Sequence, residues 1–87
     1  MNMSQYMNDK IFTVEYDSEQ ECVEIHLDEN GAAELMRVLQ ECRESASNEH
    51  VHLFTPSWGG NMLTETKQNE GAESKLINHL KIMYWKE

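Results

Sequence analysis

Apolar and polar residues alternate twice in the first third of the chain, over residues 11–17 and residues 22–28. A period of two residues is typical of a strand with one buried face. The side chains expected on the buried face are Phe12, Val14, Tyr16, Val23, Ile25 and Leu27, and those expected on the exposed face are Thr13, Glu15, Glu24, His26 and Asp28. Because residues 18–21 form a polar connector of hairpin length, the pattern predicts an antiparallel hairpin.

The apolar spacing changes to three and four residues after Asp28, which predicts a helix through about Ala46. Residues 28–30 supply capping oxygens and negative charge at its start. The stripe expected to pack on the sheet consists of Ala32, Leu35, Met36, Leu39 and Cys42. Met36 and Cys42 are interpreted as core residues rather than as chemically active groups.

Residues 50–63 combine a strand with a turn. Residues 51–54 are branched or aromatic and predict a strand, which Pro56 ends because proline has no backbone N–H. Two adjacent glycines, Gly59 and Gly60, then permit a tight turn. The turn holds Trp58, whose large ring either closes the end of the core or is presented to a partner.

The last quarter of the chain begins with a polar stretch, residues 64–74, that has no periodicity and predicts a surface loop. A loop of this length is unusual in so small a domain, which favours a binding role. Residues 75–86 then predict a final strand, in which Leu80, Ile82 and Tyr84 alternate with His79, Lys81 and Met83.

The predicted fold class is α+β with the order β-β-α-β-β, a mostly antiparallel four-stranded sheet with one helix packed on one face. Residues 1–9 are expected to form a flexible arm and residues 10–87 a single domain. A single helix covers one face only, so we expect the other face to be polar, open to water and shaped to receive another protein. That face is expected to carry Thr13, Glu15, Glu24, His26, His50, His52 and His79.

The charge balance narrows the class of partner. Sixteen acidic and seven basic residues among 87 give a formal net charge of −9, which repels nucleic acid and anionic membranes. The same charge would steer a basic protein partner, although it could also serve only to keep the domain soluble. The first ten residues contain no apolar run, so neither a secretory signal nor a membrane span is expected there, and a cytoplasmic protein is predicted. Cys22 and Cys42 are then expected to be free thiols.

Motifs for catalysis are weak. Ser57 lacks the Gly-x-Ser-x-Gly setting of a nucleophile, and the two glycines lack the lysine of a phosphate-binding loop. Four histidines, His26, His50, His52 and His79, keep a metal site open as an alternative, although no Cys-x-x-Cys pair accompanies them. The sequence therefore predicts a protein that is not an enzyme and needs no cofactor.

Several segments of the second half together resemble a family of small bacterial immunity proteins found beside polymorphic toxins. They are residues 52–56, the Ser57-Trp58-Gly59-Gly60 turn, Leu63, and residues 77–85. The resemblance implies a protein that binds and neutralises a cognate toxin domain made by the same cell. It does not identify the toxin.

The leading hypothesis is therefore an immunity protein that covers a basic toxin domain by stoichiometric contact. The residues predicted to bind this partner are Glu24, His26, His52, Ser57, Trp58, Asn61, Glu65, Glu70 and Glu73. Two alternatives remain. One is a small metal-binding protein or enzyme that uses the surface histidines, and the other is a homodimeric structural module paired through an uncovered sheet face or edge.

Overall fold

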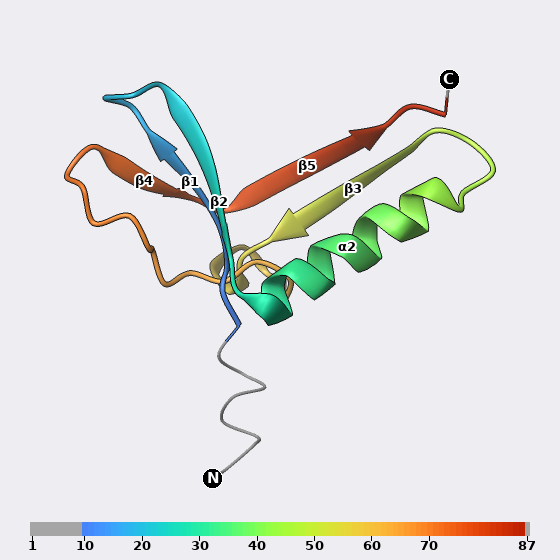
Figure 1. The fold of residues 1–87 in the computed structure, drawn as a ribbon, viewed down its shortest axis with the longest axis horizontal. Helices are drawn as coiled ribbons and strands as arrows, with labels where there is room; N and C mark the ends of the chain where they lie inside the picture. Colours follow the sequence, from blue (N-terminus) through green and yellow to red (C-terminus); the bar gives the residue numbers. More distant parts are fainter. Residues whose placement is uncertain (1–9, 87) are drawn as a thin grey trace, which may run out of the picture.

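The computed structural model describes residues 10–86, so the arm predicted for residues 1–9 lies outside the described residues. Over this range the chain forms five strands, one α-helix and one short 3-10 helix (Figure 1). In order these are β1 (Phe12–Asp17), β2 (Cys22–Leu27), α2 (Glu29–Arg43), β3 (Glu49–Phe54), η1 (Pro56–Trp58), β4 (Ser74–Ile77) and β5 (His79–Tyr84). The α+β class predicted from the sequence is confirmed.

The first sheet has the order β2-β1-β4, and both of its strand pairs are antiparallel. In the β1–β2 hairpin Val14 lies opposite Ile25, and Glu15 lies opposite Glu24. The hairpin predicted from alternation is therefore confirmed. Because β1 is central, β2 forms one edge of this sheet.

The second sheet, over the described part of the chain, consists of β3 and β5, which are also antiparallel. The predicted single four-stranded sheet is wrong because the final extended segment divides at Asn78 between the two sheets. The residues before Asn78 pair with β1 and those after it pair with β3. Thr55 fixes this break, since its N–H donates to the Asn78 carbonyl at 3.0 Å and its hydroxyl donates to the Asn78 side chain at 2.7 Å.

Helix α2 begins where its capping residue predicts. The Asp28 carboxylate accepts a hydrogen bond from the Gly31 N–H at 2.8 Å, which satisfies a free donor of the first turn. A Cβ atom on Gly31 would lie 1.9 Å from the Ile11 carbonyl oxygen, so glycine permits close approach of helix and strand. The buried residues of α2 are Gly31, Val38 and Cys42.

The apolar stripe predicted for the helix is consequently wrong in part. Met36 is 68% exposed and Leu39 is 42% exposed, whereas Val38, which was not assigned to the stripe, is buried. The core cluster instead joins β1, α2, β3 and the segment after the turn, through Phe12, Val14, Val38, Leu53 and Leu63. No helix among the described residues has both the length and the apolar character needed to cross a bilayer.

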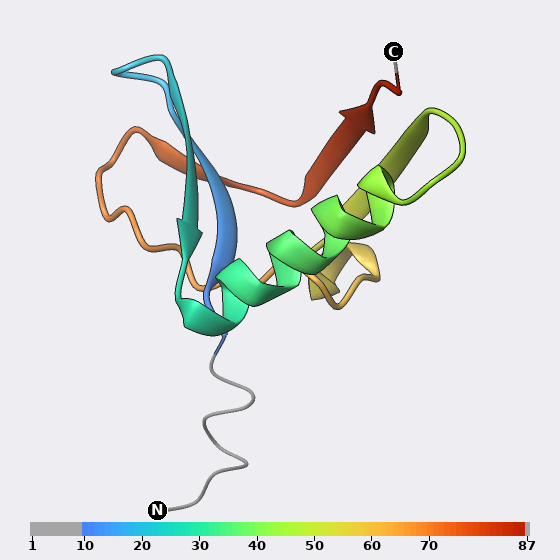
Figure 2. The same cartoon turned by 45° about the vertical axis from the view of Figure 1, so that its right-hand side comes forward.

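The two sheets diverge from a common base, and α2 runs along β3 (Figures 1 and 2). Exposure on the apolar face of the first sheet rises with distance from that base, from 38% at Leu27 to 46% at Ile25 and 64% at Val23. The prediction that these three side chains are buried is therefore wrong. Because the sheets diverge, no segment among residues 10–86 covers the far end of this face.

The opposite, polar face of the first sheet was predicted to be open, and this is also wrong. Thr13 and Glu15 are buried on it. The covering layer is the long loop of residues 64–73, which crosses back over β1. Its ends are fixed by backbone hydrogen bonds from Thr64 N–H to the Phe12 carbonyl at 2.8 Å and from Ser18 N–H to the Glu73 carbonyl at 3.1 Å.

Candidate functional site

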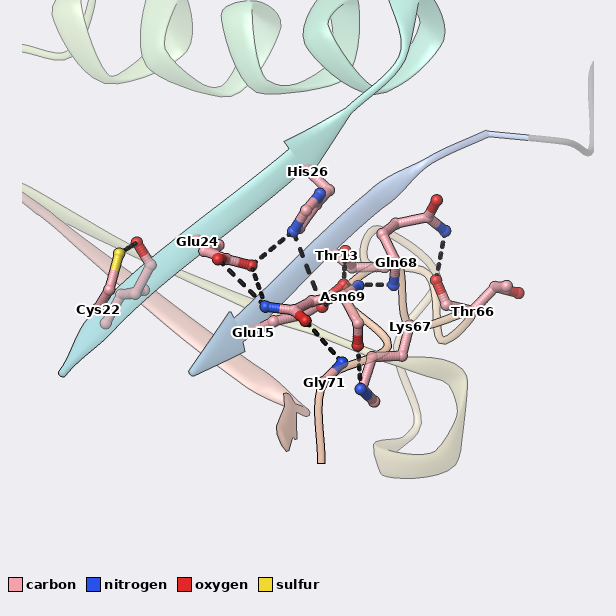
Figure 3. Close-up of polar contacts among 11 residues, drawn as sticks. Thr13, Glu15, Cys22, Glu24, His26, Thr66, Lys67, Gln68, Asn69 and Gly71 are labelled. Carbon is pink, nitrogen blue, oxygen red and sulfur yellow. Dashed lines mark hydrogen bonds and ion pairs between the residues drawn. The ribbon is translucent and has the colours of Figure 1, made fainter. Parts of the chain in front are cut away.

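The carboxylate of Glu15 holds the middle of the long loop against the sheet (Figure 3). One of its oxygens accepts from the Asn69 N–H at 2.9 Å. The other accepts from the Gln68 N–H at 2.8 Å and from the Thr13 hydroxyl at 2.6 Å. Burial alone would raise the pKa of Glu15, but these hydrogen bonds and the neighbouring His26 together hold the pKa below its usual value.

Glu24 and His26, both predicted to bind a partner, belong to the same network (Figure 3). His26 Nε2 lies 2.8 Å from a Glu24 oxygen and 3.8 Å from a Glu15 oxygen. The Asn69 side-chain amide donates to both oxygens of Glu24, at 3.1 and 3.2 Å. These two residues are half-buried and engaged with the chain's own loop.

Glu15, Glu24 and His26 each offer an atom that could bind a metal, and these atoms lie within 4.8 Å of one another. Hydrogen bonds from the loop and from Thr13 already reach the carboxylates. These three side chains are therefore best explained as an anchor that holds the loop on the sheet.

The Trp-Gly-Gly turn has a rigid backbone. The Thr55 carbonyl accepts from the N–H groups of Trp58 and Gly60, both at 2.9 Å. Gly59 has a φ of 89°, which favours glycine, and a Cβ on Gly60 would lie 2.4 Å from the Phe54 carbonyl oxygen. Both glycines thus serve the fold of the turn.

Trp58 itself projects from this turn and is 59% exposed. The end of the core is filled instead by Leu63, whose N–H donates to the Phe54 carbonyl at 3.2 Å. The sequence leaves two roles open for Trp58, closing the end of the core or facing a partner. The ring lies outside the core, so it does not close its end.

Three further predicted residues, Ser57, Asn61 and Glu65, are exposed in and after the same turn. The Ser57 N–H donates to the Glu65 carboxylate at 2.5 Å, and hydrogen bonds from Ser57 lower the pKa of Glu65. Glu65 therefore carries its negative charge at neutral pH. It also lines a hollow of about 460 Å³, whose other lining residues are Lys10, Ile11, Pro56, Thr64, Thr66 and Gln68.

The remaining predicted residues lie apart from the turn. Glu70 and Glu73 are exposed on the long loop, where Glu73 accepts a hydrogen bond from the Ser18 hydroxyl at 3.2 Å. His52 lies on the second sheet with its Nδ1 2.8 Å from His79 Nε2. Desolvation and the neighbouring His79, Lys81 and His50 lower the pKa of His52.

The four histidines of the metal alternative are divided between the two sheets. His26 contacts Glu24 on the first sheet. His50, His52 and His79 lie on the second, where the His79 ring also stacks on Phe54 with 4.4 Å between ring centroids.

No model of a protein family, no curated protein and no solved structure matches this chain.

Sequence reasoning missed one surface entirely, the exposed apolar face of β2 formed by Val23, Ile25 and Leu27. Alternation assigns such residues to the core because it cannot show how far the covering layer extends. The charge pattern of the sequence does set this region apart. Between Lys10 and Arg37 the chain has no lysine or arginine, and β2 lies within that interval.

Proposed function

We propose that this protein acts by binding another protein, as a stoichiometric inhibitor of the immunity type, and that the turn of residues 57–65 is its contact surface. The observation that carries the proposal is the exposed ring of Trp58 on a turn whose conformation is fixed by Gly59 and Gly60. Tryptophan is the residue type most enriched among those that dominate protein–protein binding energy.

Rigidity of the turn supports this role. An anchor that is already held in one conformation loses little conformational entropy on binding. The backbone hydrogen bonds to the Thr55 carbonyl and the restricted space at Gly60 hold the segment that carries Trp58. The ring can therefore be buried by a partner without reorganisation of the turn.

Charge supports a basic partner. Glu65 is ionised and lines the hollow beside the turn, so a lysine or arginine of the partner would find a carboxylate next to an apolar anchor. The formal net charge of −9 would also accelerate association with a basic protein, most strongly at low salt. The immunity-protein resemblance implies a toxin domain as the partner, and the charge of this chain implies that this domain is basic.

The test is co-expression with the toxin domain encoded by the neighbouring gene, followed by binding measurements on purified variants. We expect wild-type protein to protect cells, and Trp58→Ala to weaken binding by at least about tenfold without lowering the melting temperature appreciably. Trp85→Ala is the matched control, because Trp85 is also exposed, at 69%, but follows the end of β5 rather than lying in the turn.

Two outcomes would count against the proposal, in different ways. If the neighbouring protein kills cells equally with and without this chain, neutralisation is excluded for that pair. If protection occurs but Trp58→Ala and Trp85→Ala bind alike, the turn is not the contact surface.

A further inference from the structure

The outer edge of β2 is available for strand pairing. β2 is the terminal strand in the order β2-β1-β4, so only one of its two edges is bonded to a neighbour in the sheet. The backbone of β2 pairs with β1. Within residues 10–86 it makes one further hydrogen bond, a weak one in which the Cys22 thiol donates to the Val23 carbonyl at 3.6 Å. An unpaired edge of six residues is long enough to accept an added strand.

The side chains of this edge strand fall into two rows. Val23, Ile25 and Leu27 project on one face and are exposed to 64%, 46% and 38%. Their cross-strand neighbours on the same face include Phe12 and Val14, which are buried. An added strand would extend this apolar face outward beyond β2.

The chemistry of the partner follows from charge. The interval between Lys10 and Arg37 contains eight acidic residues, one histidine and no lysine or arginine. The acidic residues are Glu15, Asp17, Glu19, Glu21, Glu24, Asp28, Glu29 and Glu34. Glu24 lies at the middle of β2 on the polar face, and Glu21 and Asp28 flank the strand at its two ends.

A second copy of this chain fits poorly at this edge. Pairing two β2 strands would bring two such acidic segments together, and like charges on adjacent strands are destabilising. A segment with lysine or arginine would meet the same carboxylates favourably. Acidic residues around an apolar edge thus discourage self-association and admit a cationic partner.

We propose that β2 binds an extended segment of a partner protein as an added strand, in which apolar residues alternate with lysine or arginine. The apolar side chains lie beside Val23, Ile25 and Leu27, and the basic ones lie on the face of Glu24. This surface is separate from the Trp58 turn, and the inference does not depend on the function proposed there.

The probe is a phage-displayed library of random twelve-residue peptides, selected on the full-length protein. We expect enriched peptides to alternate apolar and basic residues, and the amide NMR signals of residues 22–27 to shift when a synthetic copy of one binds. Because salt screens the attraction between exposed carboxylates and basic side chains, raising the ionic strength should weaken binding of the peptide.

The variant Val23→Thr with Ile25→Thr removes apolar surface but keeps β-branched side chains that suit a strand. It should bind the selected peptide at least about tenfold more weakly. Met83→Thr is the matched control, since Met83 is 48% exposed on the second sheet and should leave peptide affinity unchanged.

Three results would overturn the inference. Enriched peptides could lack the alternating basic pattern, or they could bind the double variant as tightly as the wild type. The third is a wild-type dimer at high micromolar concentration that the double variant converts to a monomer, which would make a second copy the occupant of the edge.

Discussion

Each face of the three-stranded sheet departs in part from the environment that its composition predicts. On the polar face Thr13 and Glu15 are buried beneath the long loop, whereas on the apolar face Val23 and Ile25 are largely exposed. Composition alone would assign the opposite arrangement. Burial on this sheet is decided by which segment reaches each face.

The physical reason differs between the faces. The polar face offers the loop a carboxylate that satisfies two of its backbone N–H groups, at Gln68 and Asn69. A loop can therefore be buried there without unsatisfied donors. The apolar face depends on contact with α2 and the second sheet, and these diverge from β2 away from the base (Figure 1).

The largest expected effect comes from removing the polar anchor. Glu15→Ala deletes the acceptor of three hydrogen bonds and leaves two partly buried N–H groups without this partner, which should destabilise the fold by about 3 kcal/mol. Urea denaturation would measure this loss. Glu70→Ala, on the exposed part of the same loop, is the control and should change little. Equal stability of the two variants would mean that the loop does not depend on Glu15.

A smaller effect is expected when the same carboxylate is protonated. The pKa of Glu15 is lower in the folded protein than its usual value of 4.5, so its contribution to stability is complete above that value and declines as pH falls through the folded pKa. Only part of the Glu15→Ala loss should appear, because a protonated carboxyl group keeps acceptor capacity.

The measurement is unfolding free energy from pH 7 to pH 3 for wild type and Glu15→Gln. Other carboxylates also titrate in this range, so the difference between the two curves isolates Glu15. We expect wild type to lose stability more steeply than the variant below about pH 4.5. Parallel curves would show that the charge of Glu15 does not contribute.

Local elements were predictable from the sequence because their causes are local. Alternation located β1 and β2, and the Asp28 cap located the start of α2. The division at Asn78 was not predictable, since it depends on hydrogen bonds to Thr55, more than twenty residues away in the sequence.

Part of the candidate site was predictable because it is formed by residues close together in the sequence. The turn of Ser57, Trp58 and Glu65 is a sequence-local unit, and the structure brings these residues together as one exposed segment. Glu24 and His26 were assigned to an open face because alternation cannot show that Asn69 covers them. Whether any of these residues contacts a partner stays a prediction.

The smallest expected effect is that of Val23→Thr, at the exposed end of the apolar face. Comparison with Val14→Thr measures, with one type of substitution, how burial changes along this face. Val14 and Val23 both lie on the apolar face, but Val14 is 3% exposed and Val23 is 64% exposed. Replacing valine by threonine keeps the shape and adds a hydroxyl group. A hydroxyl without a partner costs about 1–3 kcal/mol when buried, so Val14→Thr should destabilise the fold by that amount.

Val23→Thr should change the free energy of unfolding by less than about 0.5 kcal/mol, because water can hydrate the new hydroxyl in the folded state. Urea denaturation of both variants under one set of conditions gives the comparison. If Val23→Thr were as destabilising as Val14→Thr, this end of β2 would be covered in solution, and its edge would not be open to a partner strand. A near-zero effect instead means that the apolar surface of Val23 contributes little to folding, which leaves its burial available to stabilise a complex.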